Sequence, residues 1–248
     1  MTEQEIDTAA RLLAAARQSG DRLDTLPVGP KTADEAHAIQ DRVTALLGEQ
    51  VAAYKANAPA HDEPTRAPIY ARMIRQSPAE IGAEETPDLG VEGEIAFHFT
   101  RDLGPRSAPY TRTEVAACVE ACAAIEVVSS RFRDPSSCSS LAKLADCISN
   151  GAFVPGAGNA EWADLDLNRL HVTLLVNGAP VVDQVGGHPS GDPLGVAVAL
   201  VDLMRNGPGI RAGQYVTTGS CTGLRFLSAG DRCEVAFERL GRAELVFA

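Results

Sequence analysis

The sequence predicts an α+β fold in which helices come first and a strand-rich body follows. Three observations support this class. Apolar residues recur at helical spacing over residues 3–18, residues 32–35 form a capping box that opens a second helix to about residue 47, and most segments after residue 90 alternate with period two. Helices followed by strands are typical of α+β proteins rather than of alternating α/β proteins. We expect an N-terminal helical annex, residues 1–50, and a body, residues 51–248, that together make one continuous structural unit.

Within the body, the expected elements follow from local patterns. Residues 51–55 form a short strand, and residues 56–68 form a loop rich in Pro and Ala that we expect to act as a mobile lid. A strand is expected at 91–99, followed by a helix that runs from the capping box at 111–114 through Ala123 and leads into a strand around Glu126. A short helix at 140–147 and a hairpin of strands 170–176 and 180–185 around Asn177-Gly178 come next. The last expected elements are a helix at 193–204 with Asp192 as its N-cap and strands at 214–218, 232–238 and 243–247.

Composition excludes several classes of protein. The formal net charge of -11 argues against nucleic acid or an anionic membrane as a partner. No apolar run is long enough to span a membrane. The first residues are acidic and lack the pattern of a signal peptide, so the six cysteines are expected to be reduced thiols in a cytoplasmic protein.

Three carboxylates lie on apolar strands and need an explanation. The alternation over residues 91–99 places Glu92 and Glu94 on one face of a strand, with Cα atoms about 6.5–7 Å apart. Glu126 lies in the middle of an apolar run. Two carboxylates about 4 Å apart repel by about 4 kcal/mol at an effective dielectric constant of about 20, and a hard divalent cation such as Mg²⁺ or Mn²⁺ removes this cost. The alternative is that Glu92 and Glu94 face solvent and Glu126 pairs with an Arg.

Other candidate site residues also have two interpretations. Lys55, at the end of an apolar strand, is either a proton carrier with a lowered pKa or a solvated strand-end residue. Residues 145–151 and 217–223 are rich in small donors and form either anion-binding turns or ordinary turns. His98 shares the face of the two glutamates and is either a further ligand or a hydrogen-bonded histidine near the sheet edge.

Taken together, these segments resemble the fumarylacetoacetate hydrolase superfamily, in its 2-keto-4-pentenoate hydratase / 4-oxalocrotonate decarboxylase branch. The likeness extends from about Thr32 to the C-terminus. The segments that carry it are residues 91–97, 125–131, 145–154 and 218–223, the last followed by Ala229-Gly230-Asp231.

The resemblance implies a mixed, barrel-like β-roll with flanking helices and an octahedral Mg²⁺ or Mn²⁺ site. It also implies that the metal chelates a small 2-oxo acid. The residues that it assigns to the site are Glu92, Glu94 and Glu126 as metal ligands, Lys55 and Ser149 as catalytic residues, and Arg131, Gly219 and Ser220 as substrate-binding residues.

The implied activity is that of a hydratase, which adds water to a 2-hydroxy-2,4-dienoate or unsaturated 2-oxo acid through a metal-chelated enolate, as in aromatic catabolism. Alternatives are a 4-oxalocrotonate-type decarboxylase, an acylpyruvate hydrolase and a non-catalytic partner subunit. Two departures from the family pattern bear on this choice. The segment around the lysine, usually Gly-aromatic-Lys-Ile-Gly, reads Ala53-Tyr54-Lys55-Ala56-Asn57 here, and Ile69 replaces an acid that hydratases tend to carry. Water would then be activated by His61, Asp62 or Glu63. A homo-oligomer is expected, with a complex with a sister hydratase or decarboxylase as a further option.

Overall fold

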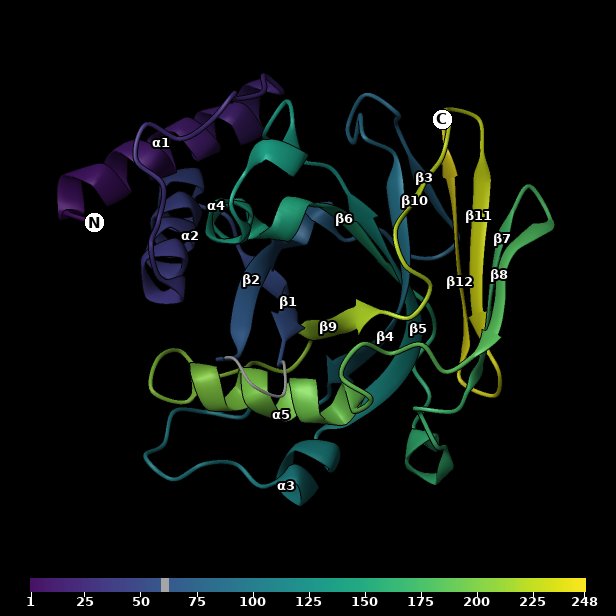
Figure 1. Ribbon diagram of the computed structural model, residues 1–248. Helices are drawn as coiled ribbons and strands as arrows, with labels where there is room; N and C mark the ends of the chain where they lie inside the picture. The colour runs from purple at the N-terminus through teal and green to yellow at the C-terminus, as the bar shows by residue number, and fades with distance from the viewer. Residues whose placement is uncertain (59–62) are drawn as a thin grey trace.

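Two N-terminal helices pack against each other as the sequence predicts. The structure is a computed structural model that describes residues 1–58 and 63–248. Helix α1 (Glu3–Ser19) begins at the capping box of Thr2 and ends at Gly20, and α2 (Ala33–Leu47) begins at Thr32 and ends at Gly48; both terminal glycines have left-handed backbones. Their apolar faces share a core with Phe132 and with α4 (Ser140–Ala145), so the annex is packed onto the body (Figure 1).

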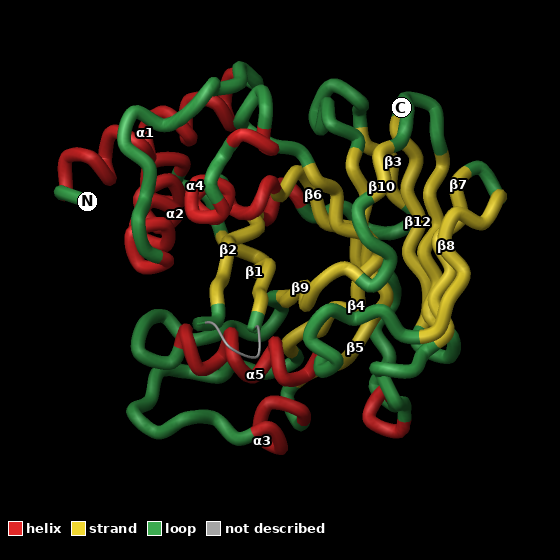
Figure 2. Tube along the Cα trace, in the orientation of Figure 1, coloured by secondary structure: helices red, strands yellow, loops and turns green. Residues whose placement is uncertain are grey.

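The first sheet of the body curls towards a barrel (Figure 2). Its strands run in the order β2-β1-β9-β4-β5-β6, and a short strand β10 pairs with the start of β4. All of these pairs are antiparallel except β1 with β9, which is parallel. The strands are β1 (Val51–Asn57), β2 (Thr65–Tyr70), β4 (Gly90–Phe99), β5 (Val119–Val128), β6 (Asn150–Pro155), β9 (Tyr215–Ser220) and β10 (Arg225–Phe226). The end strands β2 and β6 lie close to each other, which nearly closes the curl.

The second sheet packs against one face of the first. Its order is β3-β12-β11-β7-β8, and its strands are β3 (Ala79–Ile81), β7 (His171–Val176), β8 (Ala179–Val185), β11 (Arg232–Phe237) and β12 (Gly241–Phe247). The main core includes Phe97 and Ile125 of the first sheet and Val235 of the second, and α5 (Pro193–Met204) also belongs to it. Elsewhere in the described residues, helical turns occur at α3 (Arg112–Ala116) and as 3₁₀ turns at Ala71–Met73, Pro135–Ser137, Cys147–Ser149 and Trp162–Asp164.

The α+β class with a mixed, curled sheet is therefore confirmed, and two local predictions are wrong. The helix expected through Ala123 ends at Ala116, and β5 begins at Val119 because this segment pairs with β4 over its whole length. Part of the loop expected at 56–68 is strand: β1 extends to Asn57 and pairs with β2 from Thr65. Residues 59–62 of the expected lid lie outside the described part of the chain. No helix in that described part is long and apolar enough to cross a membrane.

The alternation of β4 and β5 separates two environments. Ile95, Phe97 and Ile125 face the core between the sheets. The residues between them face the inside of the curl, where Ala96 and Ala124 form an apolar floor together with residues such as Ile69 and Phe153. The glutamates of the two strands therefore also project into this interior.

Gly93 provides a test of the packing between the sheets. A Cβ atom at this position would lie 2.5 Å from Val235 Cγ2 and 2.9 Å from Thr222 Cγ2. We expect Gly93→Ala to lower the free energy of unfolding by about 1–3 kcal/mol because the added methyl overpacks this layer. Gly29→Ala is the matched control, since a Cβ there meets nothing within 4 Å. Equal urea midpoints for the two variants would show that the layer between the sheets accommodates the added methyl group.

Candidate metal centre

Glu92, Glu94 and Glu126 converge inside the curl. Glu92 lies directly opposite Glu126 in the β4–β5 ladder, and Glu94 is two residues further along β4. One carboxylate oxygen from each residue lies within 4.8 Å of the other two. The side chains of Glu94 and Glu126 are fully buried, and that of Glu92 is 17 % exposed. The interpretation of Glu92 and Glu94 as residues of a solvated sheet face is therefore wrong.

Burial and mutual repulsion make these carboxylates difficult to ionise together. Burial, followed by the negative charge of Glu126, raises the pKa of Glu94 to about 8. Burial also raises the pKa of Glu92, although Lys55 opposes this shift. The cluster therefore needs positive charge in order to carry three ionised groups.

Lys55 supplies part of that charge. It projects from β1, and its Nζ lies 2.9 Å from Glu126 Oε1 and 3.6 Å from Glu92 Oε2. Burial alone would lower the pKa of Lys55, but the carboxylates of Glu126, Glu92 and Glu94 outweigh it and raise the pKa above its ordinary value. In the metal-free protein the pKa of Lys55 is therefore raised by the surrounding acids, and the lowered pKa expected beside a bound metal stays a prediction.

The donor set fits a hard divalent cation. Within the described residues, Glu94 Oε1 and Glu126 Oε2 are buried and have no hydrogen-bond partner. The other oxygen of each of these two carboxylates accepts a hydrogen bond: Gly219 N–H donates to Glu94 Oε2 at 2.8 Å, and Asn150 Nδ2 donates to Glu126 Oε1 at 3.2 Å. Three carboxylates and one ammonium leave two uncompensated negative charges when all are ionised, so a divalent ion would neutralise the site.

The 219–222 segment is tied to β4 at the Glu-Gly-Glu motif. Cys221 N–H donates to Gly93 O at 2.8 Å, and Thr222 Oγ1 accepts from Gly93 N–H at 2.8 Å. Gly219 has φ +121, a conformation that favours glycine, and this brings its amide to Glu94. Ser220 lies opposite Glu94 in the β4–β9 ladder. Both residues expected to bind substrate here therefore adjoin the cluster, and their role in binding stays a prediction.

Ser149 lies in a buried turn beside Glu126, and Arg131, which follows β5, contacts this turn. Ser149 ends a run of three non-glycine residues with positive φ, and Asn150 follows it directly. The guanidinium group of Arg131 donates to the Asp146 carboxylate, to Asp146 O at 2.8 Å and to Asn150 O at 2.8 Å. Its donors thus hold the turn in place, and the expected contacts of Arg131 and Ser149 with substrate stay predictions.

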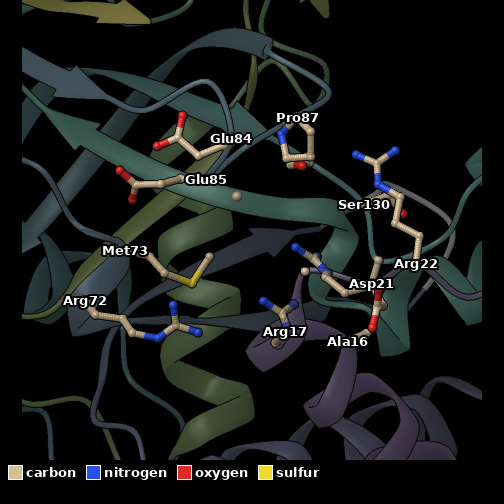
Figure 3. Close-up of a pocket in the computed structure, with 14 residues that line it drawn as sticks. Ala16, Arg17, Asp21, Arg22, Arg72, Met73, Glu84, Glu85, Pro87 and Ser130 are labelled. Carbon is tan, nitrogen blue, oxygen red and sulfur yellow. The ribbon is translucent and has the colours of Figure 1, made fainter. Parts of the chain in front are cut away.

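Two other features lie apart from the three acids. The ring of His98 stacks on Tyr215 with centroids 4.5 Å apart, and within the described residues His98 is not part of the acidic cluster. A cavity between α1 and the body is lined by Arg17, Arg22 and Arg131 together with acidic residues (Figure 3). Of the described residues that line it, none is a glutamate of the cluster.

Sequence reasoning missed the residues that orient the ligands. The amide of Asn150 on Glu126 and the carboxylate of Asp146 under Arg131 are specific contacts that the turn 145–151 alone did not indicate. The available signal was weak: polar residues adjacent to a predicted buried strand.

Comparison with known proteins agrees with this geometry. Residues 43–247 match the model of the fumarylacetoacetate (FAA) hydrolase C-terminal family. The chain belongs to this family. It is 30% identical to 2-keto-4-pentenoate hydratase of Burkholderia vietnamiensis over 99% of this chain and 98% of that protein. It is 29% identical to a 4-oxalocrotonate decarboxylase of a Pseudomonas species over 70% of this chain and 67% of that one.

A solved structure shows the same fold over the whole chain. The 4-oxalocrotonate decarboxylase from Pseudomonas putida G7, complexed with magnesium and adipate, superposes with a TM-score of 0.85 at 20% identity over 100% of this chain and 99% of that one. The predicted superfamily, its hydratase/decarboxylase branch and the prediction of a lyase are confirmed by the family match and the named relatives. That structural neighbour binds magnesium, and the acidic cluster of this chain can hold a divalent metal.

Replacing one ligand tests the metal centre directly. We expect Glu126→Gln to weaken Mg²⁺ binding at least about 10-fold, because the amide removes a charge and one anionic ligand oxygen. The fold should be retained, since a neutral side chain is easier to bury than a carboxylate. Isothermal titration calorimetry measures the affinity, with Glu120→Gln on the same strand as control. Unchanged binding in Glu126→Gln would remove this residue from the centre.

The turn beside Glu126 should depend on Asp146. This carboxylate is fully buried and pairs with Arg131 and Arg17. We expect Asp146→Ala to lower the free energy of unfolding by about 3–5 kcal/mol, because two buried cations lose their counter-charge. The matched control is Asp24→Ala, whose partner is Arg133 on the surface and whose cost should stay within about 1 kcal/mol. Chemical denaturation measures the loss of unfolding free energy in both variants. Similar losses would contradict the conclusion that Asp146 stabilises this turn.

Proposed function

We propose that this protein is a metal-dependent lyase that hydrates a small 2-hydroxy-2,4-dienoate or a related unsaturated 2-oxo acid. The observation that carries the proposal is the convergence of three glutamates beside Lys55, two of them with a buried oxygen that has no hydrogen-bond partner among residues 1–58 and 63–248. The named hydratase relatives, which match the chain over nearly its full length, support the choice of reaction. We propose Mg²⁺ or Mn²⁺ as the metal, because all three protein ligands are hard oxygens.

The bound cation would act as a Lewis acid and as a template for the carboxylate and keto oxygens of the substrate. The protein residues supply the remaining requirements. Glu92, Glu94 and Glu126 hold the ion, and Gly219 and Asn150 fix the orientation of two of these ligands. The apolar floor of the curl, including Ala124 and Phe153, excludes water from one side of the site.

Lys55 is placed to carry a proton. Its Nζ is held between Glu126 and Glu92 and is protonated in the metal-free state because of their charges. Carboxylates that also held a cation would stabilise the ammonium form of Lys55 less, so Lys55 would release its proton more readily. Lys55 would then move a proton to or from the substrate carbon next to the keto group.

Decarboxylation is the second candidate, and Ile69 is the observation that favours it. Ile69 lies on β2, is fully buried and packs on the apolar floor of the curl. It offers no acid or base to activate water at the position where hydratases tend to carry an acid. Of the expected substitutes, His61 and Asp62 lie outside the described residues, and Glu63 is exposed.

We also propose a homo-oligomer, supported by the exposed apolar side chains of Phe226 and Val185, which are 67% and 64% exposed. The expected cytoplasmic location stays a prediction.

Parallel assays separate the candidate reactions. Purified protein with Mg²⁺ or Mn²⁺ is incubated with 2-hydroxypenta-2,4-dienoate, with 4-oxalocrotonate and with an acylpyruvate. Loss of dienol absorbance without CO₂ supports the hydratase, whereas release of CO₂ from 4-oxalocrotonate supports the decarboxylase. Cleavage of the acylpyruvate alone identifies a hydrolase. Inactivity on all three substrates, with intact metal binding, contradicts the proposal and favours a non-catalytic partner subunit.

Lys55→Ala tests the proton carrier. We expect the turnover number to fall about 10²–10⁴-fold at saturating substrate and metal, because a positioned acid–base group is lost. Lys31→Ala, which removes an exposed lysine, serves as the control and should leave turnover unchanged. If Lys55→Ala changes only KM, Lys55 is a binding residue and not a proton carrier.

A further inference from the structure

The 184–190 segment, which leads from β8 towards α5, lies against the end of β9. Gln184 Nε2 donates to Cys221 O at 2.8 Å. Two close approaches accompany this hydrogen bond: a Cβ on Gly187 would lie 2.5 Å from Cys221 O, and a Cβ on Gly219 would lie 2.8 Å from Pro189 Cγ. Glycine is needed at both positions, because a side chain would collide with the Cys221 carbonyl in one case and with the Pro189 ring in the other.

His188 is the polar centre of this contact. It is 9% exposed, and its Nε2 lies 3.1 Å from Thr218 Oγ1. The single hydroxyl hydrogen of Thr218 is donated to Ile95 O at 2.6 Å, so Thr218 Oγ1 accepts from His188 Nε2–H. His188 Nδ1 is then the acceptor, and Ser190 Oγ lies 3.2 Å from it. Burial lowers the pKa of His188, which agrees with a neutral ring.

Thr218 connects His188 to a metal ligand. Its hydroxyl bonds to the backbone of Ile95, the residue after Glu94. The next residue, Gly219, donates its N–H to Glu94 Oε2 at 2.8 Å. Adjacent residues of β9 therefore donate two hydrogen bonds to β4, one to Ile95 O and one to the Glu94 carboxylate, and His188 holds the hydroxyl that makes the first. The Oε1 atom of Glu94, which is buried and has no partner within the described residues, is oriented by this arrangement.

We propose that His188 is a positioning residue for the metal centre, acting through Thr218 and Gly219 to hold Glu94 in its ligand orientation. This inference rests on the proposed metal-dependent function. Partners that orient a ligand from outside the coordination sphere typically contribute 10–100-fold to metal affinity or activity. His188 itself touches no metal ligand, so its effect must pass through the backbone of β9.

A rival role for the same segment is to form the wall of a substrate pocket. Pro189 and Ser190 border a cavity of about 520 Å³ that Asn57 also lines. Asn57 lies two residues beyond Lys55 on β1 and so on the same face of that strand. A residue that only shapes this wall would change KM for the substrate and leave metal affinity unchanged.

Three substitutions at His188 separate these roles. Gln can place an N–H near the Nε2 position, Asn can place one only near Nδ1, and Leu offers none. We expect His188→Asn and His188→Leu to weaken Mg²⁺ binding about 10–100-fold by calorimetry, and His188→Gln to stay within about 3-fold of wild type. In the metal-free protein, amide hydrogen exchange at Gly219 should be faster in the Asn and Leu variants than in wild type or His188→Gln. His171→Leu, at a half-exposed histidine paired with Asp183, is the matched control and should behave as wild type.

The outcomes decide the proposal. The positioning role is overturned if wild type, His188→Gln and His188→Asn have equal Mg²⁺ affinity and equal amide exchange at Gly219. A change in KM alone assigns His188 to the pocket wall. If His188→Leu does not fold, the comparison of Gln with Asn still decides. If wild type itself binds no Mg²⁺ or Mn²⁺, the metal centre fails and the role of His188 fails with it.

Discussion

The structure depends on the cost of placing three carboxylates in an apolar interior. Glu94 and Glu126 have no access to solvent, and Glu92 has little. An ammonium group on β1 offsets one of the three negative charges, and the two that remain would match a divalent cation. The order of the strands meets the same requirement, because β1, β4 and β5 carry the lysine and the three glutamates and must bring these side chains together. The parallel strand β9, inserted between β1 and β4, brings Gly219 to that point.

The orientation of the acids comes from segments with unusual backbone conformations. Glu126 receives a hydrogen bond from Asn150, which follows three consecutive non-glycine residues with positive φ. Glu94 receives one from Gly219, whose φ is also positive. For the three non-glycine residues this conformation costs free energy and persists only where surrounding contacts hold it, whereas glycine adopts a positive φ readily. The buried Arg131–Asp146 pair provides this support on one side of the site, and the 184–190 segment provides it on the other.

Local patterns predicted the helices of the annex, the strand with Glu92 and Glu94, and the hairpin at Asn177-Gly178, because short-range periodicity and turn chemistry decide these elements. The capping box at 111–114 predicts a helix through Ala123, but from Val119 onwards pairing with β4 overrides this local signal. Pro68 favoured a loop, yet it is tolerated in β2 because this strand lies at a sheet edge. Contacts such as His188 with Thr218 join residues that no sequence pattern relates, so only the folded chain reveals them.

The register of β4 against β5 has a consequence for folding as well as for chemistry. Because side chains alternate between faces, shifting one strand by a single residue would turn its acids into the layer that holds Phe97 and Ile125. Mispaired hairpins would then bury charge among aliphatic and aromatic groups without Lys55 nearby. The residues that suit the protein for binding a cation therefore also discriminate against incorrect strand alignment while the chain folds.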